Sequence, residues 1–246
     1  EAGKTAGGQG RTDGEEQGLF GASAYAADAG NRARTGMVVN VEARGNQGPS
    51  YLFQTSNGNG KLIDLYAGSV SHYATSSLYQ EIYQRLPNDT DLTPMLKLGV
   101  PALNFAFIGN FAQYHTPLDR RENLDPQSLQ QQGEAALGVA NGLRHADLAQ
   151  FKGGDAIYLD VIGRFLPRLP AIWGLPLSIA CFVLIALAGA ISVAGLIAGL
   201  PRELPRGSAT LAERLAVARR PDILLALSVT LFWAMGVFTL YTFIAP

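Results

Sequence analysis

Residues 13–21, DGEEQGLFG, contain two adjacent carboxylates, Glu15 and Glu16, close to the glycines Gly18 and Gly21. The glycines permit a tight turn and a close approach of the backbone. Neighbouring side chains on a turn point in different directions, so one carboxylate can bind a metal while the other acts as a general base. The alternative is an ordinary helix start, in which the opening aspartate is the N-cap and the two acids interact favourably with the helix dipole. Acidic first turns are common, so this stretch alone leaves both interpretations open.

Two later stretches place further metal-binding side chains after apolar runs. Glu42 follows the run Met37–Val41, and His115 follows the run Leu103–Ile108. A single glutamate at a strand end is usually solvated, and a single histidine is usually an ordinary surface or core residue. Together with the glutamate pair, however, they form a set of carboxylates and an imidazole on loops that each follow a buried type of strand. Such a set is typical of a metal site on an α/β sheet.

The wider motifs are the glutamate pair and the segments NVEARGNQGPS (40–50), RLPNDTDLT (85–93), PALNFAFIGN (101–110) and YHTPLDRRENLDPQSLQ (114–130). In this order they resemble the co-catalytic dizinc aminopeptidases, metallopeptidase family twenty-eight. The likeness is to the membrane-anchored branch, which includes vacuolar membrane proteases and endoplasmic-reticulum metallopeptidases. It covers about Thr12 to Leu159. It implies an α/β fold, a partial three-layer αβα zinc-exopeptidase sandwich followed by transmembrane helices.

The resemblance implies a role for each residue of the site. Glu15 would be the general base that takes a proton from a water bridging two Zn²⁺ ions. Tyr114 would donate a hydrogen bond to the tetrahedral intermediate. Glu16 and His115 would bind one zinc, and Glu42 would bind the other. The zinc pair would polarise the scissile carbonyl of a peptide substrate and anchor its free α-amine.

Other polar residues have alternative interpretations. Asp119 either orients His115 by accepting a hydrogen bond from its ring or is a helix-capping or surface residue. The segment Asn88–Asp91 either lines the substrate pocket or is a plain turn. His72 and His145 have no motif around them and are interpreted as ordinary helix or helix-edge residues.

Residues 1–12 are glycine-rich and polar, and we interpret them as a disordered or aberrant start. At this place the family has an apolar central strand. Further upstream it has a His and an Asp that complete two zinc sites of three protein ligands each. We therefore expect residues 13–160 to be the carboxy-terminal part of a zinc peptidase domain. As a 246-residue chain it would bind zinc weakly and would not be a competent peptidase. The alternatives are a non-catalytic peptidase-like ectodomain with a binding or structural role and, disfavoured by the glutamate pair and Glu42, a glutaminyl cyclase.

Apolar runs separated by turn residues predict alternating helices and strands, as in an α/β sandwich. Ala102–Ile108 is almost continuously apolar, which is typical of a strand buried on both faces. Asp125 is the expected N-cap of a long amphipathic helix from Pro126 to about Ala149, with proline at its first position. The other expected strands are Met37–Val41 and Tyr51–Thr55, and the other expected helices are 19–29, 62–67, 74–86 and 92–98.

Two uncharged runs, 169–200 and 223–246, each exceed the roughly 20 apolar residues that a transmembrane helix needs. A fully buried core helix is the alternative. The loop between them, 201–222, is expected to be cytoplasmic under the positive-inside rule. Residues 1–168 would then lie in the periplasm, the cell exterior or an organelle lumen, and membrane lipid would be a partner. The arginines of the loop are Arg202, Arg206, Arg214, Arg219 and Arg220.

Composition excludes two further classes of interaction. The formal net charge is −1, so there is no basic excess of the kind that nucleic-acid binding requires. Cys181 is the single cysteine, so an intrachain disulfide is impossible.

Overall fold

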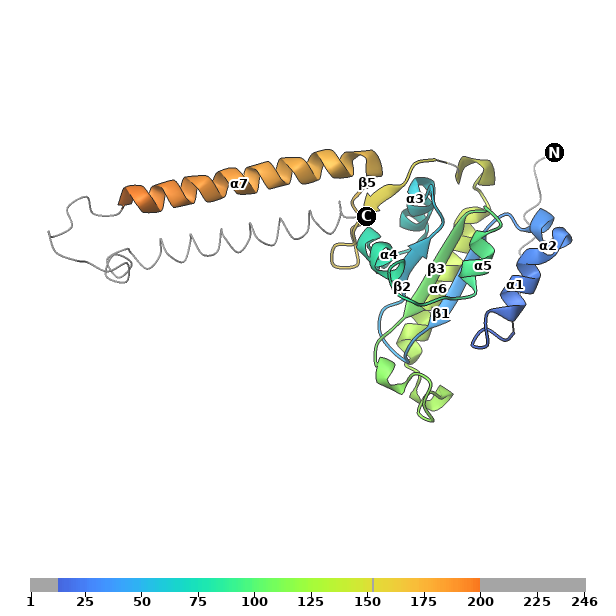
Figure 1. Cartoon of the computed structure of the whole chain (residues 1–246). Helices are drawn as coiled ribbons and strands as arrows, with labels where there is room; N and C mark the ends of the chain where they lie inside the picture. The colour runs from blue at the N-terminus through green and yellow to red at the C-terminus, as the bar shows by residue number, and fades with distance from the viewer. Residues whose placement is uncertain (1–12, 152, 200–246) are drawn as a thin grey trace. The chain divides into compact units, whose positions relative to one another are not determined.

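The computed structural model describes residues 13–151 and 153–199, and it divides the chain into two compact units. The first unit, Glu1–Ala171, contains every candidate site residue, and the second is Ile172–Pro246. The course of the chain through each unit can be followed in Figure 1. The expected aberrant start (1–12), arginine-rich loop (201–222) and second membrane span (223–246) lie outside the described residues.

The first unit is built around a three-stranded sheet. Its strands are β1 (Val38–Ala43), β2 (Tyr51–Thr55) and β3 (Ala102–Phe107), in the spatial order β1-β3-β2. β1 runs parallel to β3, whereas β2 is antiparallel to it. All six residues of β3 are buried, which confirms the strand predicted from its apolar run. Because β1 and β3 are parallel, the segments that follow them leave the same edge of the sheet, where ligands commonly bind in α/β folds.

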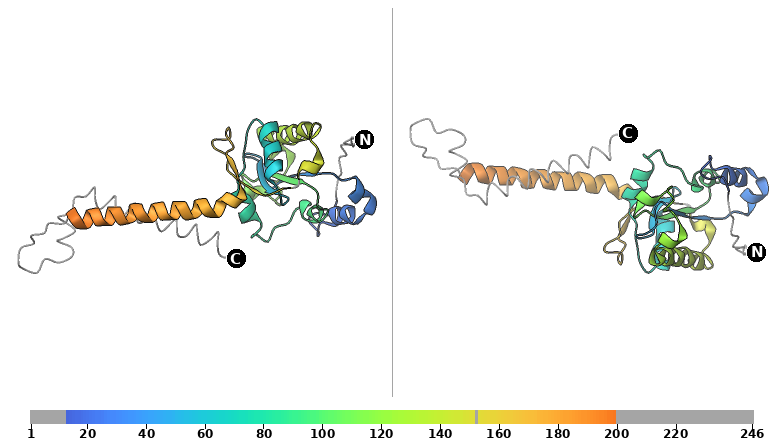
Figure 2. Two further views of the ribbon diagram at one scale, coloured as in Figure 1. Left: turned by 90° about the horizontal axis from the view of Figure 1, so that it is seen from above. Right: turned by 90° about the horizontal axis from the view of Figure 1, so that it is seen from below.

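Helices cover both faces of this sheet, as the views in Figure 1 and Figure 2 show. On one face, α3 (Gly60–Ser69) and α6 (Pro126–Leu143) pack over a core that includes Leu103 and Phe105 of β3. On the other face, α1 (Phe20–Ala27) and α5 (Leu92–Leu96) pack over a smaller cluster that includes Ala102. The alternation along β3 follows from the two-residue period of a strand. The predicted mixed α/β fold is thus confirmed.

Several predicted boundaries move. The first helix begins at Phe20, not Leu19, and ends at Ala27, and α2 (Ala29–Arg34) begins separately with Asp28 as its N-cap. The helix predicted over 74–86 is shorter, α4 (Ser77–Tyr83), and the helix predicted to reach Ala149 ends at Leu143. Its predicted cap is confirmed, because the Asp125 side chain accepts from the N–H groups of Gln127 and Ser128.

The remaining elements are η1 (Phe111–Gln113), η2 (Arg121–Asn123), η3 (Leu148–Phe151), β4 (Ala156–Tyr158), β5 (Arg168–Pro170) and η4 (Ala171–Trp173).

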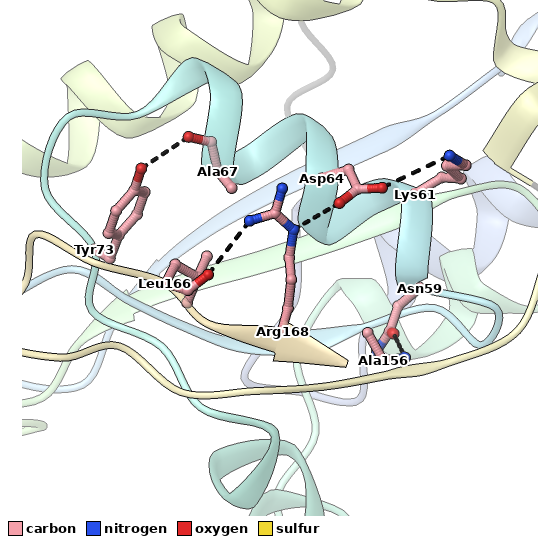
Figure 3. Close-up of polar contacts among 8 residues, drawn as sticks. All are labelled: Asn59, Lys61, Asp64, Ala67, Tyr73, Ala156, Leu166 and Arg168. Carbon is pink, nitrogen blue, oxygen red and sulfur yellow. Dashed lines mark hydrogen bonds and ion pairs between the residues drawn. The ribbon is translucent and has the colours of Figure 1, made fainter. Parts of the chain in front are cut away.

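The hairpin of β4 and β5 was not predicted from the sequence, and it is fastened to α3 (Figure 3). Arg168 Nε donates to Asp64 Oδ1 over 2.6 Å, and Asp64 also pairs with Lys61 at 3.7 Å. At the start of the helix, Asn59 Oδ1 accepts from the backbone N–H of Ala156 over 2.8 Å. These contacts hold the β4–β5 hairpin against α3.

The second unit contains α7 (Gly174–Gly199), which is 26 residues long and carries no charged residue. At 1.5 Å per residue it is about 39 Å long, more than the roughly 30 Å of a bilayer core. In the part of the chain that the structure describes, one helix is long and apolar enough to cross a membrane, with its apolar window at Ala171–Ala190. The predicted start at residue 169 is too early, because Leu169 belongs to strand β5.

The turn after β1 depends on a glycine. Gly45 has φ +157°, and a Cβ there would collide with the carbonyl oxygen of Gly109, which follows β3. We expect Gly45→Ala to lower the free energy of unfolding by about 1–3 kcal/mol or more, through backbone strain and the collision. Gly133→Ala is the matched control, because Gly133 lies in α6 with nothing within 4 Å. It should raise stability by about 0.5–1 kcal/mol. Denaturant unfolding measures the free energy of unfolding of both variants. Equal changes in Gly45→Ala and Gly133→Ala would show that the turn after β1 is not tight.

Candidate active site

The two glutamates of the first motif lie on a turn that precedes α1, not in the helix. The carbonyl oxygen of Glu15 accepts from the N–H groups of Gly18 (3.1 Å) and Leu19 (2.9 Å). Gly18 has φ +124°, as the tight-turn interpretation requires. Gly21 lies inside α1, and its N–H donates to the carbonyl oxygen of Asp13 over 2.8 Å, so the backbone approaches closely there as predicted.

The alternative of an ordinary helix start is also wrong. The N-cap position of α1 is Leu19, with no side-chain cap bond, and the first helical turn contains no acid. Asp13 instead accepts from the N–H of Gly14 over 2.8 Å. The carboxylates of Glu15 and Glu16 are therefore presented by a turn, free of any capping role.

His115 meets one of these carboxylates across 99 positions of the chain. Its Nε2 lies 2.6 Å from Glu16 Oε1, and both side chains are more than half exposed. The histidine has φ +57°, a left-handed conformation in which histidine is enriched among non-glycine residues. The Tyr114 ring stacks on the imidazole with 3.8 Å between centroids. The loop after β3 thus presents its tyrosine and histidine to the glutamate turn.

Asp119 does not contact the imidazole in the way that an orienting partner would. Its Oδ2 accepts from the backbone N–H of His115 over 3.4 Å. The Asp119 carboxylate therefore supports the loop conformation at His115. The imidazole ring itself hydrogen-bonds Glu16 through Nε2.

Glu42 lies inside β1, one residue before its end, and not after the strand as the apolar run suggested. Its Oε1 accepts from Asn40 Nδ2 over 2.8 Å, and its backbone oxygen accepts from Gln132 Nε2 over 2.7 Å. Burial raises the pKa of the Glu42 carboxyl, and the charges of Asp91 and Glu16 raise it further. The side chain is thus held by the sheet while it faces other carboxylates.

The electrostatics place Glu15 in the same group. Burial raises the pKa of Glu15, followed by the charges of Glu16, Glu42 and Asp91, while His115 lowers it. Three carboxylates and one imidazole are therefore close enough to Glu15 to affect its pKa, and a bound cation would offset the repulsion among the carboxylates. Asp91 was not predicted as a member. The sequence feature that pointed to Asp91 was its place in the 85–93 motif. From the sequence, a site segment there could not be distinguished from a plain turn.

The Tyr114 hydroxyl is affected by the same carboxylates. Burial raises the pKa of its hydroxyl, and the charges of Glu16 and Glu15 raise it further. The guanidinium of Arg44 lies 5.9 Å from the ring centroid. Tyr114 therefore keeps its proton at neutral pH and can donate a hydrogen bond at the site.

Comparison with known proteins identifies the family. The sequence profile of peptidase family M28 matches residues 11–140, more than half of the chain and every candidate site residue. The chain belongs to peptidase family M28. It is 31% identical to human endoplasmic reticulum metallopeptidase 1 over 140 residues, which are 54% of this chain and 16% of that protein. It is 30% identical to the vacuolar membrane protease of Lachancea thermotolerans over 154 residues, 61% of this chain and 16% of that protein.

The chain thus matches about a sixth of the length of these M28 relatives. No solved structure matched it significantly. The family assignment confirms the resemblance to the membrane-anchored metallopeptidases that the motifs suggested.

M28 peptidases are generally zinc-dependent, and the side chains here have the right donors. Carboxylate oxygen and imidazole nitrogen are common zinc ligands. Two ligands of a tetrahedral zinc with bonds of ~2 Å lie roughly 3.3 Å apart. Glu16 and His115 are closer, at 2.6 Å, because they share a hydrogen bond. A small opening of this pair and loss of the shared proton would make it a ligand pair.

The number of donors is smaller than a complete site needs. Within residues 13–151 and 153–199, no group of three or more His, Cys, Asp or Glu side chains is arranged to hold a metal ion. A catalytic zinc commonly has three protein ligands. The described residues therefore fit zinc in chemistry and supply only part of a coordination shell.

Proposed function

We propose that this chain contributes to a membrane-anchored zinc aminopeptidase that removes amino-terminal residues from peptides. The observation that carries the proposal is the 2.6 Å contact between Glu16 and His115, which brings two separate motifs of the M28 family together. The charge of Glu16 raises the pKa of both Glu15 and Glu42, which supports the proposal further.

In this proposal Glu16 and His115 would hold one zinc, and Glu42 would be a ligand of a second. Bound zinc would lower the pKa of water and polarise the scissile carbonyl. Glu15 would accept the proton of the attacking water and return it to the leaving amine. Its neighbour on the turn is held by His115, so Glu15 is the carboxylate left available for proton transfer. Tyr114 would donate a hydrogen bond from its hydroxyl to the oxyanion that develops on the carbonyl.

A second candidate is a peptidase-like ectodomain without catalytic activity. It is favoured by the absence, among the described residues, of any three-donor cluster that could hold a metal ion. The two candidates differ in a direct assay. Zinc-loaded protein that releases amino-terminal residues from a peptide, and stops when zinc is chelated, supports the peptidase. Peptide binding that is unaffected by zinc supports the second candidate.

The membrane anchor in this proposal is α7, followed by the arginine-rich loop on the cytoplasmic side. Cysteines introduced by Asn57→Cys and Ser208→Cys are expected to react with an impermeant reagent from opposite sides of an intact membrane. Cys181→Ser gives a cysteine-free background, because Cys181 is the single cysteine. Labelling of both positions from the same side would contradict the proposed topology.

A further inference from the structure

A row of three amide side chains crosses the whole sheet. Asn104 in β3 is the direct register partner of Asn40 in β1 and of Gln54 in β2. Asn104 is fully buried, and the other residues of its strand, β3, are apolar. Gln54 in β2 is also buried. A buried amide without hydrogen bonds is costly, so a polar row in the centre of a sheet needs partners for its donors and acceptors.

The central amide of this row has those partners. Asn104 Oδ1 accepts from Asn40 Nδ2 over 3.0 Å. Asn104 Nδ2 donates to Gln54 Oε1 and to Thr90 Oγ1, each over 2.9 Å. An asparagine amide has two N–H groups, and both are used here. The orientation of the Asn104 amide is therefore fixed from β2 and from the loop before α5.

This orientation is passed on to Glu42. Asn40 donates one N–H to Asn104 Oδ1, which leaves its second N–H to donate to Glu42 Oε1 over 2.8 Å. Residues 40 and 42 lie on the same face of β1, because side chains of a strand alternate. If Asn104 did not accept from Asn40, the Asn40 amide could turn its oxygen toward the Glu42 carboxylate, which would repel it.

The same row fixes the neighbouring loop. Thr90, which accepts from Asn104, is adjacent to Asp91, whose backbone hydrogen-bonds the Glu42 carboxylate. The carboxylate of Glu42 is thus held from two sides, by Asn40 in the sheet and by the loop at Asp91. Both supports lead back to the single buried side chain of Asn104.

We propose that Asn104 is a positioning residue for Glu42, acting through Asn40 and the Thr90–Asp91 loop. The inference rests on the proposed function only in taking Glu42 as a zinc ligand. A ligand held by its neighbours before the metal arrives binds more tightly than one that must be ordered on binding. Loss of such supporting hydrogen bonds typically lowers metal affinity about 10- to 100-fold.

The test compares Asn104→Leu with Asn59→Leu in the full chain. Asn59 is another buried amide, which donates to Thr55 Oγ1 and accepts from the backbone N–H of Ala156, so its side chain is bonded away from the site carboxylates. Zinc affinity is measured by competition with a chromophoric chelator, and stability by thermal unfolding. Both variants should unfold at lower temperature, but only Asn104→Leu should weaken zinc binding, by about tenfold or more. Equal affinities of the two variants would overturn the inference.

A metal-free double-mutant cycle separates this inference from the proposed function. With chelator present, the shifts in unfolding midpoint caused by Asn104→Leu and Glu42→Leu should be non-additive, because the two residues belong to one network. The shifts of Asn59→Leu and Glu42→Leu should add. Additivity for the Asn104 pair would overturn the positioning role whatever the zinc result. Non-additivity in a chain that binds no zinc would instead contradict the metal site and leave the positioning of Glu42 supported.

Discussion

Replacing His115 by asparagine is expected to lower the zinc affinity of the chain by at least about tenfold, since losing even an outer partner of a ligand costs 10- to 100-fold. The reason is geometric. Among the candidate ligands, Glu16 and His115 are in direct contact, with 2.6 Å between Oε1 and Nε2. Without the imidazole, Glu16 remains an exposed carboxylate on a turn. Asparagine is chosen because it tolerates the left-handed backbone conformation of this position.

His72→Asn is the matched control for this experiment, because His72 lies away from the site motifs. Glu16→Gln should reproduce the loss of zinc affinity. The variant that carries both Glu16→Gln and His115→Asn should retain only nonspecific zinc binding. The affinities are measured by chelator competition. An unchanged affinity in His115→Asn, or an equal loss in His72→Asn, would contradict a zinc site at the Glu16–His115 contact.

The second large effect is expected from Glu15→Gln. In any preparation that hydrolyses peptides, whether this chain with excess zinc or a longer form containing it, kcat should fall by about 10²- to 10⁴-fold. Glutamine keeps the size of the side chain but cannot accept the proton of the attacking water. Because Glu15 is not assigned as a ligand, zinc affinity should change much less than in His115→Asn. Steady-state kinetics with an aminoacyl-amide substrate, together with zinc affinity, measures both quantities.

Glu134→Gln, on the exposed surface of α6, is the control for this loss of charge. Its kcat should match that of the unchanged chain. A Glu15→Gln variant that keeps its turnover would rule out Glu15 as the base. A variant that loses zinc and turnover together would show that Glu15 is a ligand and not the base.

The strands were predictable because hydrophobic patterning determines which segments are buried on both faces. The run Ala102–Ile108 became β3 over Ala102–Phe107, all six residues of which are buried, and Tyr51–Thr55 became β2 without change. Asp125 was predictable as a cap because an aspartate before proline satisfies the first N–H groups of a helix. The pairing of Glu16 with His115 was also predictable, although only by resemblance to a family and not by physical reasoning.

The features that were missed depend on contacts between distant segments. A glutamate pair before a helix is compatible with a cap or a turn, and the positive φ values of Gly14 and Gly18 decide for the turn. Asp91 joins the site only because its loop lies against Glu42. The amide row requires the register of β1 and β2 against β3, which cannot be deduced from one strand alone.

The zinc site is tested most directly by X-ray absorption at the zinc edge on the zinc-loaded chain. The chain contains three histidines, so the source of any imidazole signal can be assigned by substitution. We predict nitrogen and oxygen scatterers at about 2.0–2.2 Å with one imidazole contribution, which disappears in His115→Asn and persists in His72→Asn and His145→Asn. An imidazole signal that survives the loss of His115, or a zinc environment without imidazole, would contradict the zinc site that the Glu16–His115 contact supports.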